Sequence, residues 1–357
     1  MTIQSEQTGV RPTTSAAATP GTAGDATPAT GPGPDFPQAT DQYRRELFAH
    51  CYRMTGSVHD AEDLVQETYL RAWRAYHGFE GRSSVRTWLH RIATNVCLTA
   101  LEGRDRRPMP TGLGAPASDP GDPVEANGEV PWLEPAPDQA LGDPATLVAD
   151  RDTVRLAFVA ALQHLPARQR AVLVLRDVLR WRAAEVAEAM ETTVASVNSA
   201  LQRAHATLAK ADLHEDAVGE PTGAQRQLLD RYVQAFWDKD IDAIVSMLTR
   251  DAIWEMPPHT GWYQGAVEIG RLIEQQCPGG PRDMRLVPAR ANGQPAFGLY
   301  MRDGTVFRPF HLQVLTLGAG GVEHVGAFFD PGLFPVFGLP ESLPEEPAPA
   351  TAGPSGS

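Results

Sequence analysis

The sequence predicts a multidomain protein in which two all-α domains precede an α+β domain, and two patterns support this plan. Apolar residues recur at helical spacing over two separate stretches, about residues 41–107 and 150–214. After residue 222, two helical patterns are followed by strand-like runs that Gly, Pro and Asp-Gly interrupt. Helices followed by such strands are typical of an α+β domain. A chain of 357 residues is long enough for two or three separate cores.

Composition narrows the function classes. The formal net charge is −13, but residues 41–107 hold eleven Arg against nine acidic residues, and residues 151–214 hold nine Arg or Lys against six. Local basic charge is what a nucleic acid meets. The three cysteines have no paired spacing, so we expect no disulfide, no metal site and no cofactor. No apolar run approaches a membrane span and the N-terminus lacks a signal-peptide core, so we expect a cytoplasmic protein without a membrane partner.

The first 38 residues are mainly Ala, Thr, Pro and Gly, and we expect them, like residues 341–357, to be disordered because they can bury little apolar surface. Helical pattern begins near Asp41, and Asp60 is placed to cap the next helix. That helix has one apolar face. Its opposite face carries a leucine among acidic and amide side chains, which suits docking better than solvation: Asp63, Gln66, Glu67 and Leu70.

A short polar loop, residues 78–86, leads to a helix that ends near residue 101. The loop and helix combine cations, hydroxyls and an aromatic ring, a mixture that can hold phosphates and stack on unpaired bases. The candidates are Arg82, Ser83, Arg86, Trp88, Arg91 and Asn95. From residue types alone, an ordinary helical hairpin with Trp88 in its core and solvated arginines explains the pattern equally well.

Residues 108–146 form a Pro-rich linker with seven acidic residues and neither Lys nor Arg, which predicts an extended segment. Within it, Trp132 and Leu133 are a chance apolar pair or, as we favour, an anchor that packs onto another part of the protein.

The second helical stretch ends in two short helices separated by Glu191-Thr192-Thr193, which is a helix-turn-helix pattern. Its second helix carries side chains that can contact base edges and phosphates in a major groove: Ser196, Asn198, Ser199, Gln202 and Arg203.

The third domain combines helices with a predicted antiparallel sheet, and four of its apolar side chains could line a cavity: Trp254, Met256, Trp262 and Phe310. Ordinary core packing explains them as well. Four residues could serve as an acid or base, with two tyrosines as hydrogen-bond donors, although no spacing requires it: Asp251, His311, His324 and Asp330, with Tyr263 or Tyr300. We therefore predict no enzyme activity.

Three groups of motifs resemble known families. DAEDLVQETYLRAW followed by RSSVRTWLHRIATNVCL resembles region 2 of bacterial sigma factors of the extracytoplasmic-function (ECF) group, and the helix-turn-helix resembles their region 4. WLEP is similar to a linker motif of sigma factors with an extra C-terminal domain. WEMPPHTGWYQG and GAFFDPGLFPVFGLP resemble the cone-shaped SnoaL-like fold. The domains would be region 2 at 39–107, the linker at 108–146, region 4 at 147–214 and the SnoaL-like domain at 222–340.

The sigma-factor resemblance implies that the first candidate surface binds the clamp helices of the largest subunit of core RNA polymerase. It also implies that the second surface holds melted promoter DNA and that the helix-turn-helix binds duplex promoter DNA. The linker would approach the active-site and RNA-exit channels. The C-terminal domain would regulate in cis in place of a separate anti-sigma protein, with a small apolar ligand as a further partner. On the helix-turn-helix, Asn198 stands where the family often has a basic residue.

Two other function classes fit parts of the sequence. A helix-turn-helix regulator would bind an operator without polymerase. A SnoaL-like isomerase or cyclase with a DNA-binding appendage would turn over a substrate, and Asp330→Asn would abolish that activity.

Overall fold

The structure is a computed structural model that describes residues 35–143, 151–210 and 221–345. The predicted disorder of residues 1–34 and 346–357 falls outside these ranges. That prediction is wrong for residues 341–345, which include the short strand β7 (Leu343–Pro344). It is also wrong for residues 35–38, since they begin helix α1 (Asp35–Thr40). Phe36 is buried there, and its ring lies 5.1 Å from that of Tyr76.

The first domain is a helical bundle. Its elements are η1 (Asp41–Tyr43), α2 (Arg44–Thr55), α3 (Val58–Ala75), η2 (Tyr76–Gly78) and α4 (Val85–Ala100). Helix α2 ends at Gly56, which has φ +71°, a left-handed conformation that glycine adopts without strain. The N-cap of α3 is Ser57, whose hydroxyl accepts from the N–H of Asp60, so the expected cap at Asp60 is wrong by three residues. Cys51 and Cys97 are buried neighbours, and the hydrogen bond with Cys97 raises the pKa of Cys51.

The second domain contains the predicted helix-turn-helix. Its elements are α7 (Arg151–Val154), α8 (Leu156–Leu162), α9 (Ala167–Leu173), η4 (Val174–Val178), α10 (Ala183–Ala189) and α11 (Val194–Leu208). Val186 and Val197 are buried where α10 and α11 pack together. The Thr193 hydroxyl caps α11 by accepting from the N–H of Ser196.

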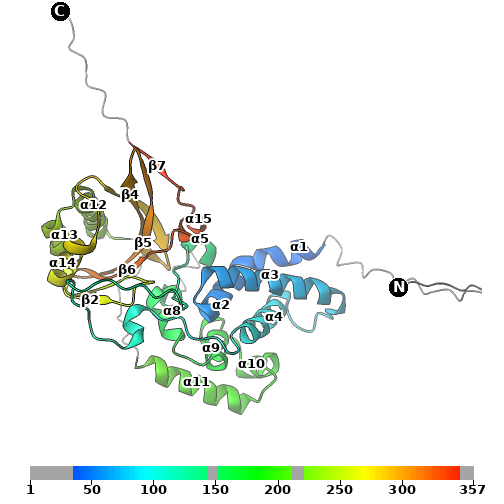
Figure 1. Ribbon diagram of the computed structural model, residues 1–357. Coiled ribbons are helices and arrows are strands. Elements are labelled where there is room, and N and C mark those ends of the chain that lie inside the picture. The colour runs from blue at the N-terminus through cyan, green and yellow to red at the C-terminus, as the bar shows by residue number, and fades with distance from the viewer. Residues whose placement is uncertain (1–34, 144–150, 211–220, 346–357) are drawn as a thin grey trace, which may run out of the picture.

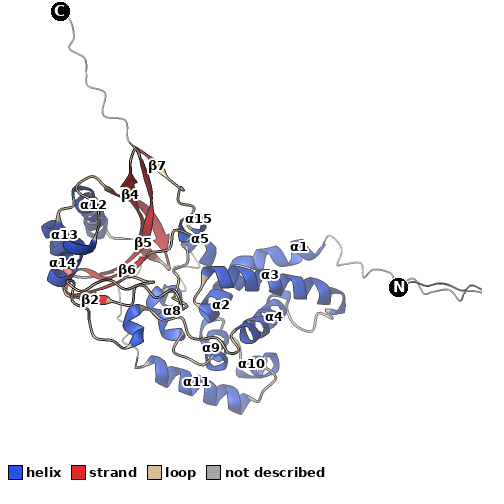
Figure 2. Ribbon diagram, viewed as in Figure 1, coloured by secondary structure: helices blue, strands red, loops and turns tan. Residues whose placement is uncertain are grey.

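The third domain is a helix-covered sheet, as Figure 2 shows. Its helices are α12 (Gly223–Asp238), α13 (Ile241–Met247), α14 (Ala266–Gln276) and α15 (Leu333–Val336). Its strands are β1 (Leu248–Glu255), β2 (Trp262–Gln264), β3 (Met284–Ala291), β4 (Gln294–Asp303), β5 (Val306–Gly318), β6 (Gly321–Phe328) and β7 (Leu343–Pro344). The strand order is β2-β1-β6-β5-β4-β3, with β7 on β5. Since β1 and β6 pair in parallel, the sheet is mixed and the antiparallel prediction is wrong for that pair.

The two faces of this sheet bury different partners. One face, with Trp254 and Leu299, packs against α12–α14 and forms the interior of the cone. The other face, with Val314 and Ala296, shares a core with the helical domains (Figure 1). The third domain therefore packs against the first two.

The linker is bound rather than free. It includes η3 (Pro110–Leu113) and α5 (Asp138–Leu141), and several of its backbone groups pair with the third domain. The N–H of Ser118 donates to the carbonyl of Trp262 (2.8 Å), and that of Asn127 donates to the carbonyl of Pro258 (2.8 Å). Residues 108–143 thus follow the surface of the sheet domain. The composition predicted an extended linker but did not predict these contacts.

Candidate nucleic-acid interface

The outward face of α3 is the first candidate surface. Ser57 starts the helix, and four residues on its inner side anchor it in the core: Ala61, Val65, Thr68 and Ala72. Asp63 and Gln66 on the outer side are exposed, and half of the Leu70 side chain is exposed. Glu67 is partly exposed and accepts from Arg71 Nε at 2.6 Å. The surface is therefore an apolar side chain ringed by acidic and amide groups.

Sequence reasoning missed one member of this surface. Trp73 is 41% exposed, which is unusual for a tryptophan, and it follows Leu70 by three residues on the same side of the helix. The spacing from Gln66 through Leu70 could have identified it. Trp73 enlarges the exposed apolar patch, a feature typical of protein–protein contact sites.

The loop before α4 and the start of that helix form the second candidate surface. Trp88 is partly exposed, and its ring lies 4.9 Å from that of Phe79 and 6.3 Å from that of Tyr76. Phe79 was not among the candidates, although its place in the polar loop signals it. Arg82 and Ser83 are exposed in the loop, and Asn95 is half-buried further along α4. Aromatic rings beside exposed cations can stack on and neutralise single-stranded nucleic acid.

All three arginines of this surface face carboxylates. Arg82 Nε lies 3.3 Å from Glu80 Oε2 in the loop. Arg86 Nε lies 2.7 and 2.9 Å from the two carboxylate oxygens of Glu46. The hydrogen bond to Glu46 raises the pKa of Arg86. Arg91 is exposed and lies 3.8 Å from Glu188, which belongs to α10 of the second domain. A carboxylate of the helix-turn-helix domain thus lies beside Arg91.

The third candidate surface is the outer side of α11. All five predicted residues are exposed: Ser196, Asn198, Ser199, Gln202 and Arg203. Val197 and Ala204 hold the opposite side against the domain core. Arg203 donates to the hydroxyl of Ser199 at 2.6 Å, which orients the guanidinium along the helix. An exposed helix with amide, hydroxyl and guanidinium groups has the donors and acceptors that reading a major groove requires.

The predicted linker anchor lies between the first and third domains. Leu133 is fully buried, and its Cδ1 lies only 2.8 Å from where a Cβ on Gly56 would stand. The indole N–H of Trp132 donates to the carbonyl of Asn127 (2.9 Å). Glu134 accepts from the Ser57 hydroxyl and the Val58 N–H, both at 2.9 Å. A carboxylate at this position also interacts favourably with the N-terminal end of the α3 dipole.

Asn292 joins all three domains and the linker, and sequence reasoning missed it. It is fully buried in the turn between β3 and β4 with φ +55°. Its Nδ2 donates to the Val154 carbonyl (2.7 Å) and to the Tyr52 hydroxyl (3.1 Å), and its Oδ1 accepts from the Ala136 N–H (2.8 Å). Its place in an Asn-Gly turn indicated only a hairpin.

A second set of contacts ties the two helical domains directly. The Arg170 guanidinium of α9 is buried and donates to the carbonyl of Met54 at the end of α2 and to Gln163 Oε1 at 2.7 Å. Burial lowers the pKa of Arg170 to about 10, so it stays charged at neutral pH. Arg53 donates through Nε to the carbonyl of Thr153 at 3.0 Å. Each arginine donates to a backbone carbonyl of the other helical domain. These hydrogen bonds exist only while the two domains keep this relative position.

The four predicted cavity residues occupy different environments. Trp254 and Met256 are buried in the core beside α12–α14, and Phe310 is partly buried against it. Trp262 donates its indole N–H to the carbonyl of Ala115 in the linker (3.0 Å). None of the four lines the cavity of about 640 Å³ that lies on the other face of the sheet. Their role as ligand contacts stays a prediction.

The six residues considered for acid–base chemistry do not form one site. His311 faces the cone interior, where burial lowers its pKa to about 3, whereas His324 lies on the opposite face of the sheet. Tyr300 donates to the carbonyl of Pro340, and Asp330 accepts from the Gly332 N–H in an exposed turn. Of the six, Asp251 on β1 and His324 line the cavity on the outer face of the sheet, whereas Tyr263 lies on β2.

Comparison with known proteins defines the class. The family model of sigma-70 region 2 matches residues 40–107, and that of sigma-70 region 4 matches residues 155–208. The chain is thus a sigma-70-type protein whose α3 and α4 lie in region 2 and whose α11 lies in region 4. Among the described residues, no helix is both long and apolar enough to cross a membrane.

A relative defines the group within that class. Over 314 residues, 87% of this chain and 85% of the relative, the sequence is 60% identical to the ECF RNA polymerase sigma factor SigG of Mycobacterium tuberculosis. The chain belongs to the ECF RNA polymerase sigma factors. It is also 31% identical over 239 residues to SigJ of the same organism, covering 64% of this chain and 69% of SigJ.

A solved structure extends the likeness to the whole fold. The crystal structure of M. tuberculosis SigJ matches with a TM-score of 0.54 at 24% identity, covering 84% of this chain and 98% of the other. That coverage reaches beyond the two sigma regions into the sheet domain. The predicted fold class, two helical sigma domains followed by an α+β SnoaL-like domain, is confirmed.

Proposed function

We propose that this chain directs promoter recognition by core RNA polymerase and that its C-terminal domain regulates this activity in cis. The α3 surface, with Asp63, Gln66, Glu67 and Leu70, binds the clamp helices of the polymerase. The observation that supports this most is the exposure of Leu70 and Trp73 among polar groups, since a folded protein has no structural reason to expose both.

The DNA contacts follow from the other two surfaces. The loop before α4 and the helix itself hold melted promoter DNA, with Arg82, Arg86 and Arg91 at phosphates and Trp88 beside unpaired bases. The outer side of α11 binds upstream duplex DNA. We place region 2 at 39–107, region 4 at 147–214 and the SnoaL-like domain at 222–340, as the sequence suggests. Acting with polymerase implies a cytoplasmic location, and the chain itself catalyses no reaction.

In the structure the three domains pack together, which we call the closed arrangement, and in this arrangement the C-terminal domain inhibits promoter binding. Glu188 stands beside Arg91, Arg170 holds region 4 against region 2, and Asn292 holds the C-terminal domain against both. Promoter binding requires region 4 to separate from α4, because Glu188 repels the phosphates that Arg91 would bind. The linker anchor at Trp132 and Leu133 transmits the position of the sheet domain to the start of α3.

A paired substitution tests the polymerase surface. Leu70→Asp places a charge at the centre of the α3 face, and we expect it to abolish run-off transcription with core polymerase and to abolish co-purification with the core. Val267→Asp is the matched control, because Val267 is 66% exposed on α14, away from α3. It should leave both readouts unchanged. Full transcription with Leu70→Asp would refute the role of the α3 surface. Absence of run-off transcription with the wild-type chain and core polymerase, together with operator binding in the absence of polymerase, would instead identify a conventional helix-turn-helix regulator.

A further inference from the structure

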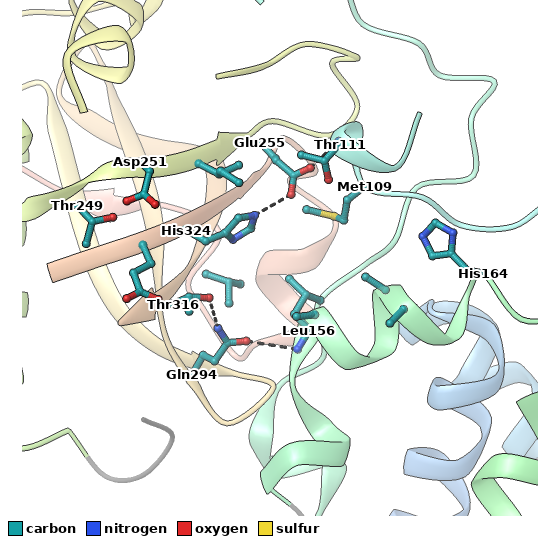
Figure 3. A pocket seen from close by; sticks show the side chains of 16 residues that line it. Met109, Thr111, Leu156, His164, Thr249, Asp251, Glu255, Gln294, Thr316 and His324 are labelled. Carbon is teal, nitrogen blue, oxygen red and sulfur yellow. Dashed lines mark hydrogen bonds and ion pairs between the residues drawn. The ribbon is translucent and has the colours of Figure 1, made fainter. Parts of the chain in front are cut away.

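The cavity of about 640 Å³ lies between the outer face of the sheet and the second helical domain (Figure 3). Strands β1, β4, β5 and β6 form one wall, helix α8 forms the facing wall, and Met109 and Thr111 of the linker close one side. The volume is within the range of small-molecule sites. Because α12–α14 cover the other face of the sheet, this cavity is separate from the cone interior.

Two hydrogen bonds between domains frame the cavity. Gln294 Oε1 on β4 accepts from the N–H of Leu156, the first residue of α8, at 3.3 Å. Glu255 Oε1 on β1 accepts from the N–H of Thr111 in the linker at 2.7 Å. Both walls are therefore fixed relative to each other only while the domains keep the closed arrangement.

The two walls differ in polarity. The α8 wall presents Leu156, Ala157 and Ala160, which are apolar and leave room for a hydrocarbon chain. The sheet wall presents three carboxylates, on Asp251, Glu255 and Glu323. A site with one apolar and one acidic wall suits an amphipathic molecule whose polar end is positively charged.

Among the described residues, neither histidine of the lining forms an ion pair with Asp251. His324 Nε2 lies 2.7 Å from Glu255 Oε2, so it compensates that carboxylate alone. Burial would raise the pKa of Glu255, but the hydrogen bond with His324, its charge and the Thr111 N–H outweigh burial and lower the pKa. Burial and the charges of Arg106 and Arg170 lower the pKa of His164, whose ring is therefore neutral at pH 7.

An unpaired hydroxyl marks the polar end of the cavity. The Oγ1 atom of Thr249 is buried and has no hydrogen-bond partner among the described residues. Thr249 and Asp251 are alternate residues of β1, and both point to the cavity side of the sheet in Figure 3. A hydroxyl oxygen and a carboxylate side by side can accept two of the three N–H groups of a primary ammonium ion.

We propose that this cavity binds an amphipathic organic amine, with its ammonium group at Asp251 and Thr249 and its hydrocarbon chain along α8. The three walls come from the sheet, the linker and region 4, so the amine binds only the closed arrangement. By linkage it then stabilises that arrangement and reduces transcription. This last consequence rests on the proposed function, whereas the site itself does not.

Calorimetry of the full chain tests the site without polymerase. The probes are n-octylamine, n-octanol and octanoate, which share a chain length and differ in charge. We expect octylamine to bind, octanol to bind about tenfold more weakly and octanoate not to bind. Asp251 is exposed, so Asp251→Asn should raise the dissociation constant of octylamine only about fivefold, the size of an exposed ion pair, and leave that of octanol unchanged.

A substitution that fills part of the cavity tests where octylamine binds. Ala157→Leu should weaken octylamine at least tenfold, whereas Ala206→Leu, at an exposed alanine of α11 outside the cavity, should have no effect. Equal binding of octanoate and octylamine, or octylamine binding that neither Asp251→Asn nor Ala157→Leu changes, would overturn the proposal.

Run-off transcription then separates the two hypotheses. Octylamine at ten times its dissociation constant should reduce transcripts about tenfold with the wild-type chain and not with Ala157→Leu. Binding with unchanged transcription would refute the regulatory consequence and leave the site. Absence of transcription at every amine concentration would count against the proposed function alone.

Discussion

Asn292→Gly tests whether the closed arrangement is inhibitory. Glycine accepts the left-handed backbone of position 292, and the β3–β4 turn exists in both the closed and the open arrangement, so backbone effects largely cancel. The substitution removes the three side-chain hydrogen bonds to Val154, Tyr52 and Ala136. At about 1 kcal/mol each, their loss shifts the closed–open equilibrium by about 3 kcal/mol, or roughly a hundredfold.

Two assays measure that shift. Hydrogen exchange should show faster exchange of the Ala136 N–H, which loses its acceptor, and run-off transcription should rise at equal protein concentration. Arg282→Gly is the control, because Arg282 also has a left-handed backbone, with φ +70°, but lies exposed on the sheet domain. It should change neither assay. If Asn292→Gly accelerates exchange at Ala136 and leaves transcription unchanged, the arrangement opens without consequence and the inhibitory role is wrong.

Three further predictions concern stability, DNA binding and the anchor. The folded pKa of His311 is lowered to about 3, so the stability it contributes is complete above its unfolded pKa near 6.5 and is lost as pH falls; between pH 7.5 and 5.5 the loss of stability in urea unfolding should be smaller in His311→Asn than in the wild type by about 1.4 kcal/mol. Arg203→Ala should lower the salt dependence of duplex binding by about one unit of slope, measured by fluorescence anisotropy, whereas Asn198→Ala should change base preference at constant slope. Glu134→Gln removes the charge at the start of α3 and should lower the free energy of unfolding by about 1 kcal/mol; an unchanged free energy would refute a stabilising role of this carboxylate.

The sequence was informative where a residue's role depends on its own helix. The spacing of Asp63, Gln66 and Leu70 requires them to share one face, and the buried Ala61 and Val65 fix which face is exposed. The same reasoning applies to α11, where Val197 and Ala204 turn the polar side outward. For these elements periodicity alone decides exposure, and the structure places the side chains accordingly. Their binding to polymerase and DNA stays a prediction.

Contacts between domains could not be predicted from the sequence in this way. Arg170, Arg53 and Asn292 all bond to backbone carbonyls of distant segments, and a carbonyl is present at every residue. No complementary residue type in the sequence therefore signals the pairing. The linker illustrates the same limit, since its acidic, Pro-rich composition predicts extension but its backbone pairs with the strands that follow residue 248.

The contacts that hold the closed arrangement differ from those proposed for polymerase and DNA, and this difference makes a switch feasible. The α3 surface is exposed in the closed arrangement, so polymerase can bind it before the domains separate. Among the described residues, Arg91, beside Glu188, is a proposed DNA contact that also contacts another domain. Polymerase binding and promoter capture are then separate steps. The Asn292 and Arg170 contacts oppose only the second step, so weakening them should increase promoter capture without changing affinity for the core enzyme.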